Sequence, residues 1–107
     1  MIQGIPGAVK AVVAQVDESA VVILFGSRAR GEATALSDWD FLILTLQETT
    51  IDYQDQIRAL LYEVELANGV VISSVIENIE IWKLYKESEF YKNISKEGVE
   101  ILLQKAA

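Results

Sequence analysis

Apolar residues recur along the chain at two spacings, one typical of helices and one typical of strands. Helical spacing of apolar residues over residues 6–16 predicts a first helix. The chain's single proline stands at its start, where the first turn of a helix tolerates proline. A second helix is predicted over residues 52–67, where an apolar stripe ends at Asn68 and Gly69. A third is predicted over residues 88–97 with Gly98 at its end, and the residues after Gly98 favour neither state.

Three short runs of strand-forming residues separate these helices. Residues 20–25 and 70–76 are rich in valine and isoleucine and are predicted to be strands. Residues 38–46 open with carboxylates and are then apolar on both faces, so this strand is expected to lie centrally in a sheet covered on both sides. The order of elements predicts an α+β fold with helices packed on a small mixed β-sheet, and residues 1–107 are expected to form one domain.

Charge and composition exclude several classes of function. The net charge is −7 and the nine Lys and Arg residues are spread thinly, so no nucleic-acid partner is expected. The chain has neither cysteine nor histidine, which excludes disulfides, thiolate nucleophiles, imidazole bases and Cys/His zinc sites. Any chemistry must therefore use carboxylates, hydroxyls, Lys or Arg, and hard cations such as Mg²⁺ are the natural cofactors.

Hydropathy points to a cytoplasmic protein with a buried interface. Apolar residues make up 51% of the chain, more than a small layered core needs, so part of them is expected at an interface with a partner or a second copy. The N-terminus does not have the basic and then apolar pattern of a signal peptide. The longest apolar run, over residues 20–25, is too short to span a membrane, and no membrane partner is expected.

Residues 26–40, GSRARGEATALSDWD, combine two features that suit phosphate and metal chemistry. Gly26 permits a tight bend after the first strand, and Ser27 can donate to a phosphate oxygen. If Arg28 begins a helical turn, consecutive backbone N–H groups form an anion site there. On the dipeptide alone, an ordinary strand-to-helix turn is the favoured interpretation.

Asp38 and Asp40 are two residues apart on a predicted strand, so they project from the same face about 7 Å apart. A divalent cation, most plausibly Mg²⁺ held with substrate phosphates, would relieve their repulsion. The alternative is a solvated pair at the entrance of the strand. Trp39 alternates to the opposite face and is expected in the core. Only twelve residues join the two strands, so the turn and the carboxylates can face each other across a gap that fits a metal-bound triphosphate.

The chain also carries a motif. Gly26-Ser27, Ala29-Arg30-Gly31 and Ser37-Asp38-Trp39-Asp40, followed by an apolar strand, resemble the signature of the minimal nucleotidyltransferases of the DNA polymerase β superfamily. The resemblance implies a polymerase β-like core, contacts from Gly26 and Ser27 to ATP or another nucleoside triphosphate, and catalytic, Mg²⁺-binding roles for Asp38 and Asp40. It leaves two roles open for Arg30: holding a phosphate, or closing the loop through a carboxylate. A carboxylate pair is the favoured role for Arg28.

The family commonly supplies a third carboxylate from the next core strand. Here that strand contains Ser73 and Ser74, and a neutral serine cannot replace a carboxylate as ligand or base. Glu65 and Glu77 flank the strand, and they are expected to be a solvated helix residue and a turn residue.

Three functions remain open at this point. The first is Mg²⁺-dependent transfer of NMP, with AMP preferred, from a nucleoside triphosphate to a hydroxyl acceptor. Minimal relatives often pair with a helical HEPN protein as a toxin–antitoxin couple, so the resemblance implies that such a partner carries the acceptor. The second is a catalytically weak or inactive antitoxin that acts by binding the HEPN-like partner. The third is a structural α+β domain in which the motif is coincidental.

Overall fold

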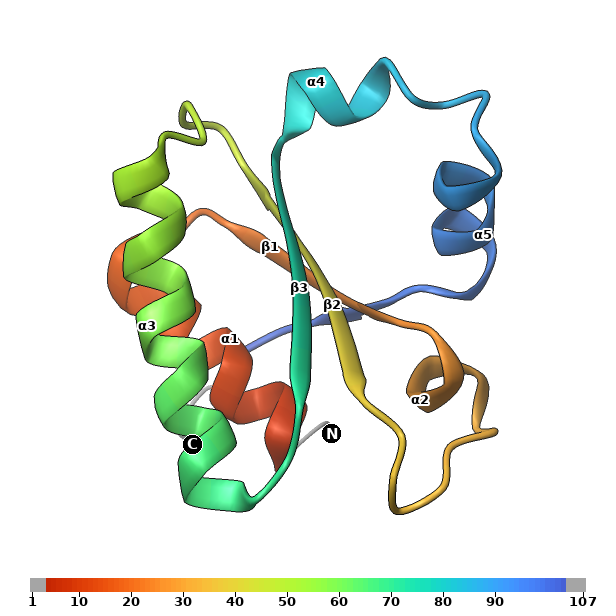
Figure 1. Cartoon of the computed structure of the whole chain (residues 1–107). Helices are drawn as coiled ribbons and strands as arrows, with labels where there is room; N and C mark the ends of the chain where they lie inside the picture. Colours follow the sequence, from red (N-terminus) through yellow and green to blue (C-terminus); the bar gives the residue numbers. More distant parts are fainter. Residues whose placement is uncertain (1–3, 104–107) are drawn as a thin grey trace.

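The computed structural model describes residues 4–103 of the 107-residue chain and contains a four-stranded mixed sheet in the order β3-β2-β1-β4. Helices α1 and α3 lie on one face of this sheet, and α4 and α5 lie on the other (Figure 1). The elements in chain order are α1 (Ile5–Val16), β1 (Val21–Phe25), α2 (Ser27–Arg30), β2 (Trp39–Thr45), α3 (Ile51–Asn68), β3 (Ile72–Asn78), α4 (Ile79–Lys83), α5 (Glu89–Glu97) and β4 (Val99–Ile101).

Strand β2 is an interior strand, as its apolar sequence predicts. It pairs antiparallel with β1 and parallel with β3, and every residue from Phe41 to Thr45 is buried. Because parallel strands cannot be joined by a hairpin, the chain crosses from β2 to β3 through the long helix α3. The α+β fold on a small mixed sheet is therefore confirmed.

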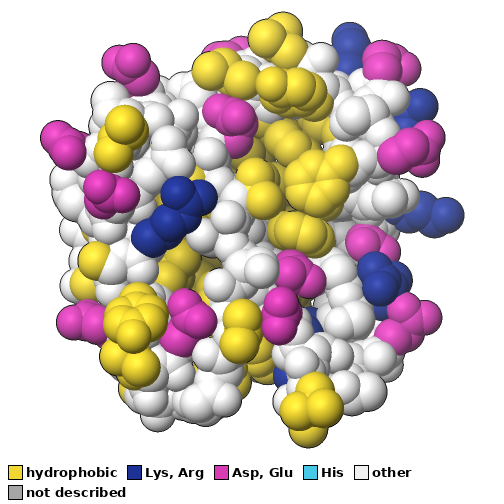
Figure 2. Space-filling view, viewed as in Figure 1, with side chains coloured by type: hydrophobic (Ala, Val, Ile, Leu, Met, Phe, Trp, Pro, Cys, Tyr) yellow, Lys and Arg dark blue, Asp and Glu magenta, His cyan; other side chains and the backbone are white. Residues whose placement is uncertain are grey.

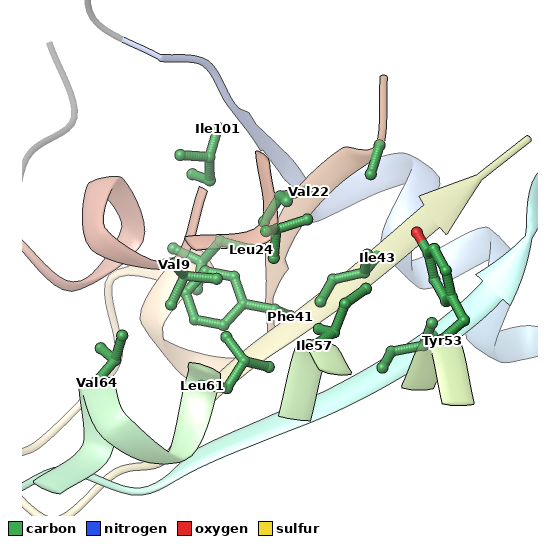
Figure 3. Packing of buried hydrophobic residues seen from close by; sticks show 13 residues of the cluster. Val9, Val22, Leu24, Phe41, Ile43, Tyr53, Ile57, Leu61, Val64 and Ile101 are labelled. Carbon is green, nitrogen blue, oxygen red and sulfur yellow. The ribbon is translucent and has the colours of Figure 1, made fainter. Parts of the chain in front are cut away.

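Alternating residues of β2 supply the cores on the two faces of the sheet. Phe41 and Ile43 pack against α1 and α3, where Val9 and Ile57 are fully buried (Figure 3). Leu42 and Leu44 point to the opposite face and pack against Trp82 of α4 and Ile94 of α5. Asp40 has the same parity as Leu42 and Leu44, so its side chain belongs to the face covered by α4 and α5.

A buried carboxylate connects three elements at the far end of β2. Asp17, just after α1, accepts hydrogen bonds from Ser19, from Thr45 of β2 and from the Tyr53 hydroxyl of α3. Burial acts to raise the pKa of Asp17, but the hydrogen bonds from Thr45, Ser19 and Tyr53 outweigh it and lower the pKa below its ordinary value. The charged carboxylate is thus satisfied in the core.

The three predicted helices and three predicted strands are all present, with shifted ends. Strand β3 begins two residues later than predicted and continues to Asn78, so Glu77 lies in the strand and its expected turn position is wrong. The short helix α4 was not predicted, and the ambiguous residues after Gly98 form β4 at the sheet edge. Within residues 4–103, no helix is both long and apolar enough to cross a membrane.

Candidate active site

The turn after β1 presents free backbone N–H groups. Gly26 has a φ of 77°, which favours glycine, and its carbonyl accepts hydrogen bonds from the N–H groups of Ala29 and Arg30, each at 3.1 Å. The N–H groups of Ser27 and Arg28 donate to no other group within residues 4–103. This single helical turn therefore leaves two adjacent donors, together with the Ser27 hydroxyl, available to an anion.

The turn lies directly against the carboxylate of Asp40. In the antiparallel pair of β1 and β2, Phe25 is the register partner of Asp40, which places Gly26 beside the Asp40 side chain. A Cβ atom at Gly26 would collide with Oδ2 of Asp40. The structure thus brings together the two halves of the motif that the sequence places fourteen residues apart.

Asp38 and Asp40 form an electrostatically strained pair. Asp38 is exposed and lies just before β2. Asp40, the second residue of β2, is half-buried. Burial raises the pKa of Asp40, the charge of Asp38 raises it further, and the nearby Arg30 guanidinium partly offsets both. No side chain within residues 4–103 donates a hydrogen bond to either carboxylate. Two oxygen-rich anionic groups beside an open glycine turn fit a hard divalent cation such as Mg²⁺.

The neighbouring strand contributes a hydroxyl where a third carboxylate would stand. Ser73 of β3 is the register partner of Asp40 and faces the same side of the sheet. Glu77 shares that side but pairs with Leu44, about 13 Å along the strand from Ser73. Ser74 points to the opposite face, where it lines a hollow with Glu65 of α3. Within the part of the chain that the structure describes, no three acidic side chains gather into a metal-binding group.

Arg30 is paired with two carboxylates at the surface. Its Nε donates to Glu32 at 2.6 Å and its Nη1 donates to Glu97 of α5 at 3.1 Å. The pair with Glu32 closes the loop, which was one of the two roles left open for Arg30. The contact with Glu97 joins residues 67 positions apart in the sequence, and no pattern in the chain predicts it.

Among the described residues, 4–103, Arg28 pairs with no carboxylate, so the structure contradicts the role favoured for it from the sequence. Its Nη2 donates to the backbone carbonyl of Ser37 at 2.9 Å. The guanidinium lies 4.3 Å from the centroid of the Trp39 ring, a cation–π contact. The sequence predicts Trp39 in the core, and the Trp39 side chain does pack against the cluster around Phe41. Its ring also makes the cation–π contact with Arg28.

Comparison with known proteins decides the family. The model of the family described as "Polymerase beta, Nucleotidyltransferase" matches residues 8–106, nearly the whole chain. The chain belongs to this family. It is therefore a nucleotidyltransferase by sequence and by fold.

One relative by sequence and two solved structures are similar to this nucleotidyltransferase. A protein of Methanocaldococcus jannaschii named "Putative protein adenylyltransferase" is 36% identical over 77 residues, which cover 72% of each chain. A crystal structure of a toxin–antitoxin with AMP-PNP aligns with a TM-score of 0.54 at 13% identity, over 90% of this chain and 74% of that one. The crystal structure of a "putative nucleotidyltransferase" from Sulfolobus solfataricus aligns with a TM-score of 0.50 at 20% identity, over 94% of this chain and 81% of that one. At these identities the two structures show the shared fold.

Proposed function

We propose that this nucleotidyltransferase moves AMP from ATP to a hydroxyl acceptor on a protein, with Mg²⁺ held by Asp38 and Asp40. The observation that carries the proposal is the contact between the Gly26–Ser27 turn and the Asp40 carboxylate. An anion-binding turn and a cation-binding pair in contact are what a triphosphate with its metal needs. The relative named as a protein adenylyltransferase supports ATP and a protein acceptor.

Each group of the site has a separate task in this proposal. The N–H groups of Ser27 and Arg28 and the Ser27 hydroxyl donate to phosphate oxygens. Arg30 exchanges a carboxylate partner for a phosphate when the nucleotide binds, because its pairs with Glu32 and Glu97 are partly exposed and cost little to break. The cation, when bound, neutralises charge on the phosphates.

The transfer is a displacement at the α-phosphorus of ATP. The acceptor oxygen forms a bond to this phosphorus, the bond to the bridging oxygen breaks, and pyrophosphate leaves with that oxygen. The hydroxyl proton passes to solvent, since Ser73 stands where a carboxylate base would accept it.

The acceptor has a surface to bind beside the carboxylates. Val75, Trp82, Tyr85 and Phe90 line a hollow of about 310 Å³ between β3, α4 and α5, and Figure 2 shows apolar side chains gathered around it. Val75 pairs with Leu42, which is the next residue of β2 after Asp40 to face this side of the sheet. A protein segment seated in this hollow lies close to the site of transfer.

Transfer of label tests the proposal. Wild-type protein is incubated with ATP labelled at the α-phosphate, Mg²⁺ and a candidate acceptor protein, beside the double variant Asp38→Asn/Asp40→Asn. We expect label on protein with the wild type and none with the variant. Absence of label with every acceptor, or equal labelling by the variant, would contradict the proposal.

A second function, neutralisation of a HEPN-like helical partner by binding alone, is favoured by one observation. Ser73 beside Asp40 leaves the site without a general base, which suits a protein that blocks its partner rather than modifying it. The double Asp variant separates the two functions. If it neutralises the partner as well as the wild type does, occlusion is supported. If it binds the partner without neutralising it, catalysis is supported.

A further inference from the structure

The loop between α2 and β2 joins the phosphate side of the site to its carboxylate side. It leaves α2 at Gly31, which has a φ of 74°, and ends at Asp38. Within it, the Thr34 N–H donates to the Ser37 hydroxyl at 2.9 Å, which folds the end of the loop into a turn. The position of the Asp38 carboxylate therefore depends on how this exposed loop is held.

The Arg28 side chain reaches across this loop from α2. It contacts the residue before Asp38 through the Ser37 carbonyl, at 2.9 Å, and the residue after it through the Trp39 ring, at 4.3 Å. Its Nε is buried and has no hydrogen-bond partner within residues 4–103, so these two contacts anchor the guanidinium. Arg28 thus holds both neighbours of Asp38 without pairing with its carboxylate.

Trp39 gives this arrangement a rigid base. Its backbone N–H donates to the Val71 carbonyl at 2.9 Å, and its side chain packs against the core between the sheet and helices α1 and α3. A guanidinium stacked on a ring fixed in this way transmits the rigidity of the sheet to the loop. Lysine would keep the charge but lose the flat stack and the fixed direction of donation.

We infer that Arg28 is a positioning residue: clamped between the Trp39 ring and the Ser37 carbonyl, its guanidinium holds Asp38 in place for the divalent cation. The inference rests on the proposed function, because the role of Asp38 toward the cation belongs to it. In the proposed function the backbone N–H of Arg28 donates to a phosphate, whereas its side chain acts on the cation side of the site. Groups that orient metal ligands commonly change metal affinity by about 10- to 100-fold when they are replaced.

Binding measurements on Arg28→Lys separate positioning from direct nucleotide contact. ATP affinity is measured by calorimetry without metal and over a series of Mg²⁺ concentrations. We expect the Mg²⁺ concentration for half-maximal enhancement to rise roughly ten-fold and the metal-free affinity to fall by a much smaller factor. Amide hydrogen exchange over residues 31–38 is expected to become faster. Arg58→Lys, an exposed arginine of α3, is the matched control and should change neither property.

Variants of Trp39 test the stack itself. Trp39→Phe keeps a ring and should retain most of the Mg²⁺ response, whereas Trp39→Leu should match Arg28→Lys, and the double variant should be no worse than either single one. Unchanged Mg²⁺ dependence in Arg28→Lys, an equal loss of metal-free affinity, or additive effects in the double variant would each overturn the inference. Failure of the wild type to bind ATP in an Mg²⁺-dependent way would overturn the proposed function as well, so the two failures are distinguishable.

Discussion

Ser73 lies directly beside Asp40, as its register partner in the parallel pair of β2 and β3. Register partners on neighbouring strands project to the same face with their Cβ atoms close together. The site therefore has a hydroxyl, with no useful basicity, next to its half-buried carboxylate. This relationship fixes where a third carboxylate must be added if the chain is short of one.

Ser73→Asp should speed up nucleotidyl transfer. A carboxylate at this position can accept the acceptor's proton and supply a further metal ligand, and a positioned general base contributes about 10²- to 10⁴-fold. We expect kcat to rise roughly ten-fold or more in a labelled-ATP assay at saturating Mg²⁺. Ser74→Asp adds the same charge on the opposite face and should leave kcat unchanged. An equal effect of both substitutions would refute the placement.

Gly26→Ala should impair both nucleotide binding and folding. The φ of 77° disfavours alanine, and the added Cβ would meet Oδ2 of Asp40. We expect a loss of about 1–3 kcal/mol in the free energy of unfolding and no detectable ATP binding. Gly69→Ala is the matched control, because Gly69 also has a positive φ, 63°, but nothing lies within 4 Å of its added Cβ. It should lose stability and keep ATP binding; loss of binding in both would point to unfolding rather than to the site.

Asp40→Asn should abolish transfer and raise stability. Burial and the charge of Asp38 place the pKa of Asp40 above its ordinary value, so the ionised form costs folding free energy at neutral pH. A group whose pKa is raised on folding contributes stability at low pH that is lost as the pH rises through the folded-state pKa. The amide removes this loss, and we expect the Tm at neutral pH without metal to rise by a few degrees.

Mg²⁺ distinguishes the two forms in the same experiment. The cation should raise the Tm of the wild type, because it binds the folded state, and should leave the Tm of Asp40→Asn unchanged. Asp52→Asn, an exposed position at the start of α3, serves as the control for removing one negative charge. A Tm of Asp40→Asn below that of the wild type in the absence of metal would contradict the strained pair.

The sequence predicts the parts of this fold that local spacing controls. Helix α1 is predicted by the spacing of its valines, and the end of α3 by Asn68-Gly69. Strand β2 is predicted by a sequence that is apolar on both faces. Strand β4 is three residues long and exists because it pairs with β1, and α4 occupies five residues after the Asn78 cap. Elements this short carry little periodicity of their own, so only tertiary contacts define them.

The same division holds for the site. The motif selected Gly26, Asp38 and Asp40 as candidates because their spacing and residue types are local properties. The Ser73 register, by contrast, depends on where β3 begins, which was predicted two residues too early. The contact of Arg28 with Ser37 and that of Arg30 with Glu97 of a distant helix were missed, because a guanidinium at the end of a long side chain selects its contacts in three dimensions.

Tyr53→Phe should destabilise the fold in a pH-dependent way without affecting the site. The Tyr53 hydroxyl donates to Oδ2 of Asp17 at 2.8 Å, and losing a hydrogen bond to a buried charged group costs about 1.5–3 kcal/mol. The pKa of Asp17 is lowered from 3.8 on folding, so this contribution is full above that value and is lost as the pH falls through the folded-state pKa. The stability difference between wild type and variant should therefore shrink in acid.

Alkaline pH should shrink the difference for a separate reason. Burial raises the pKa of Tyr53 from 10.0 to about 12, so the wild type loses stability as the pH rises between these values, whereas phenylalanine does not ionise. Urea unfolding at about pH 3, 7 and 11 measures the difference on both sides of its maximum. Tyr62→Phe, an exposed tyrosine of the same helix, is the control and should show no difference at neutral pH. A gap that stayed constant from acid to alkali would show that Tyr53 stabilises the fold by packing alone, because packing does not titrate.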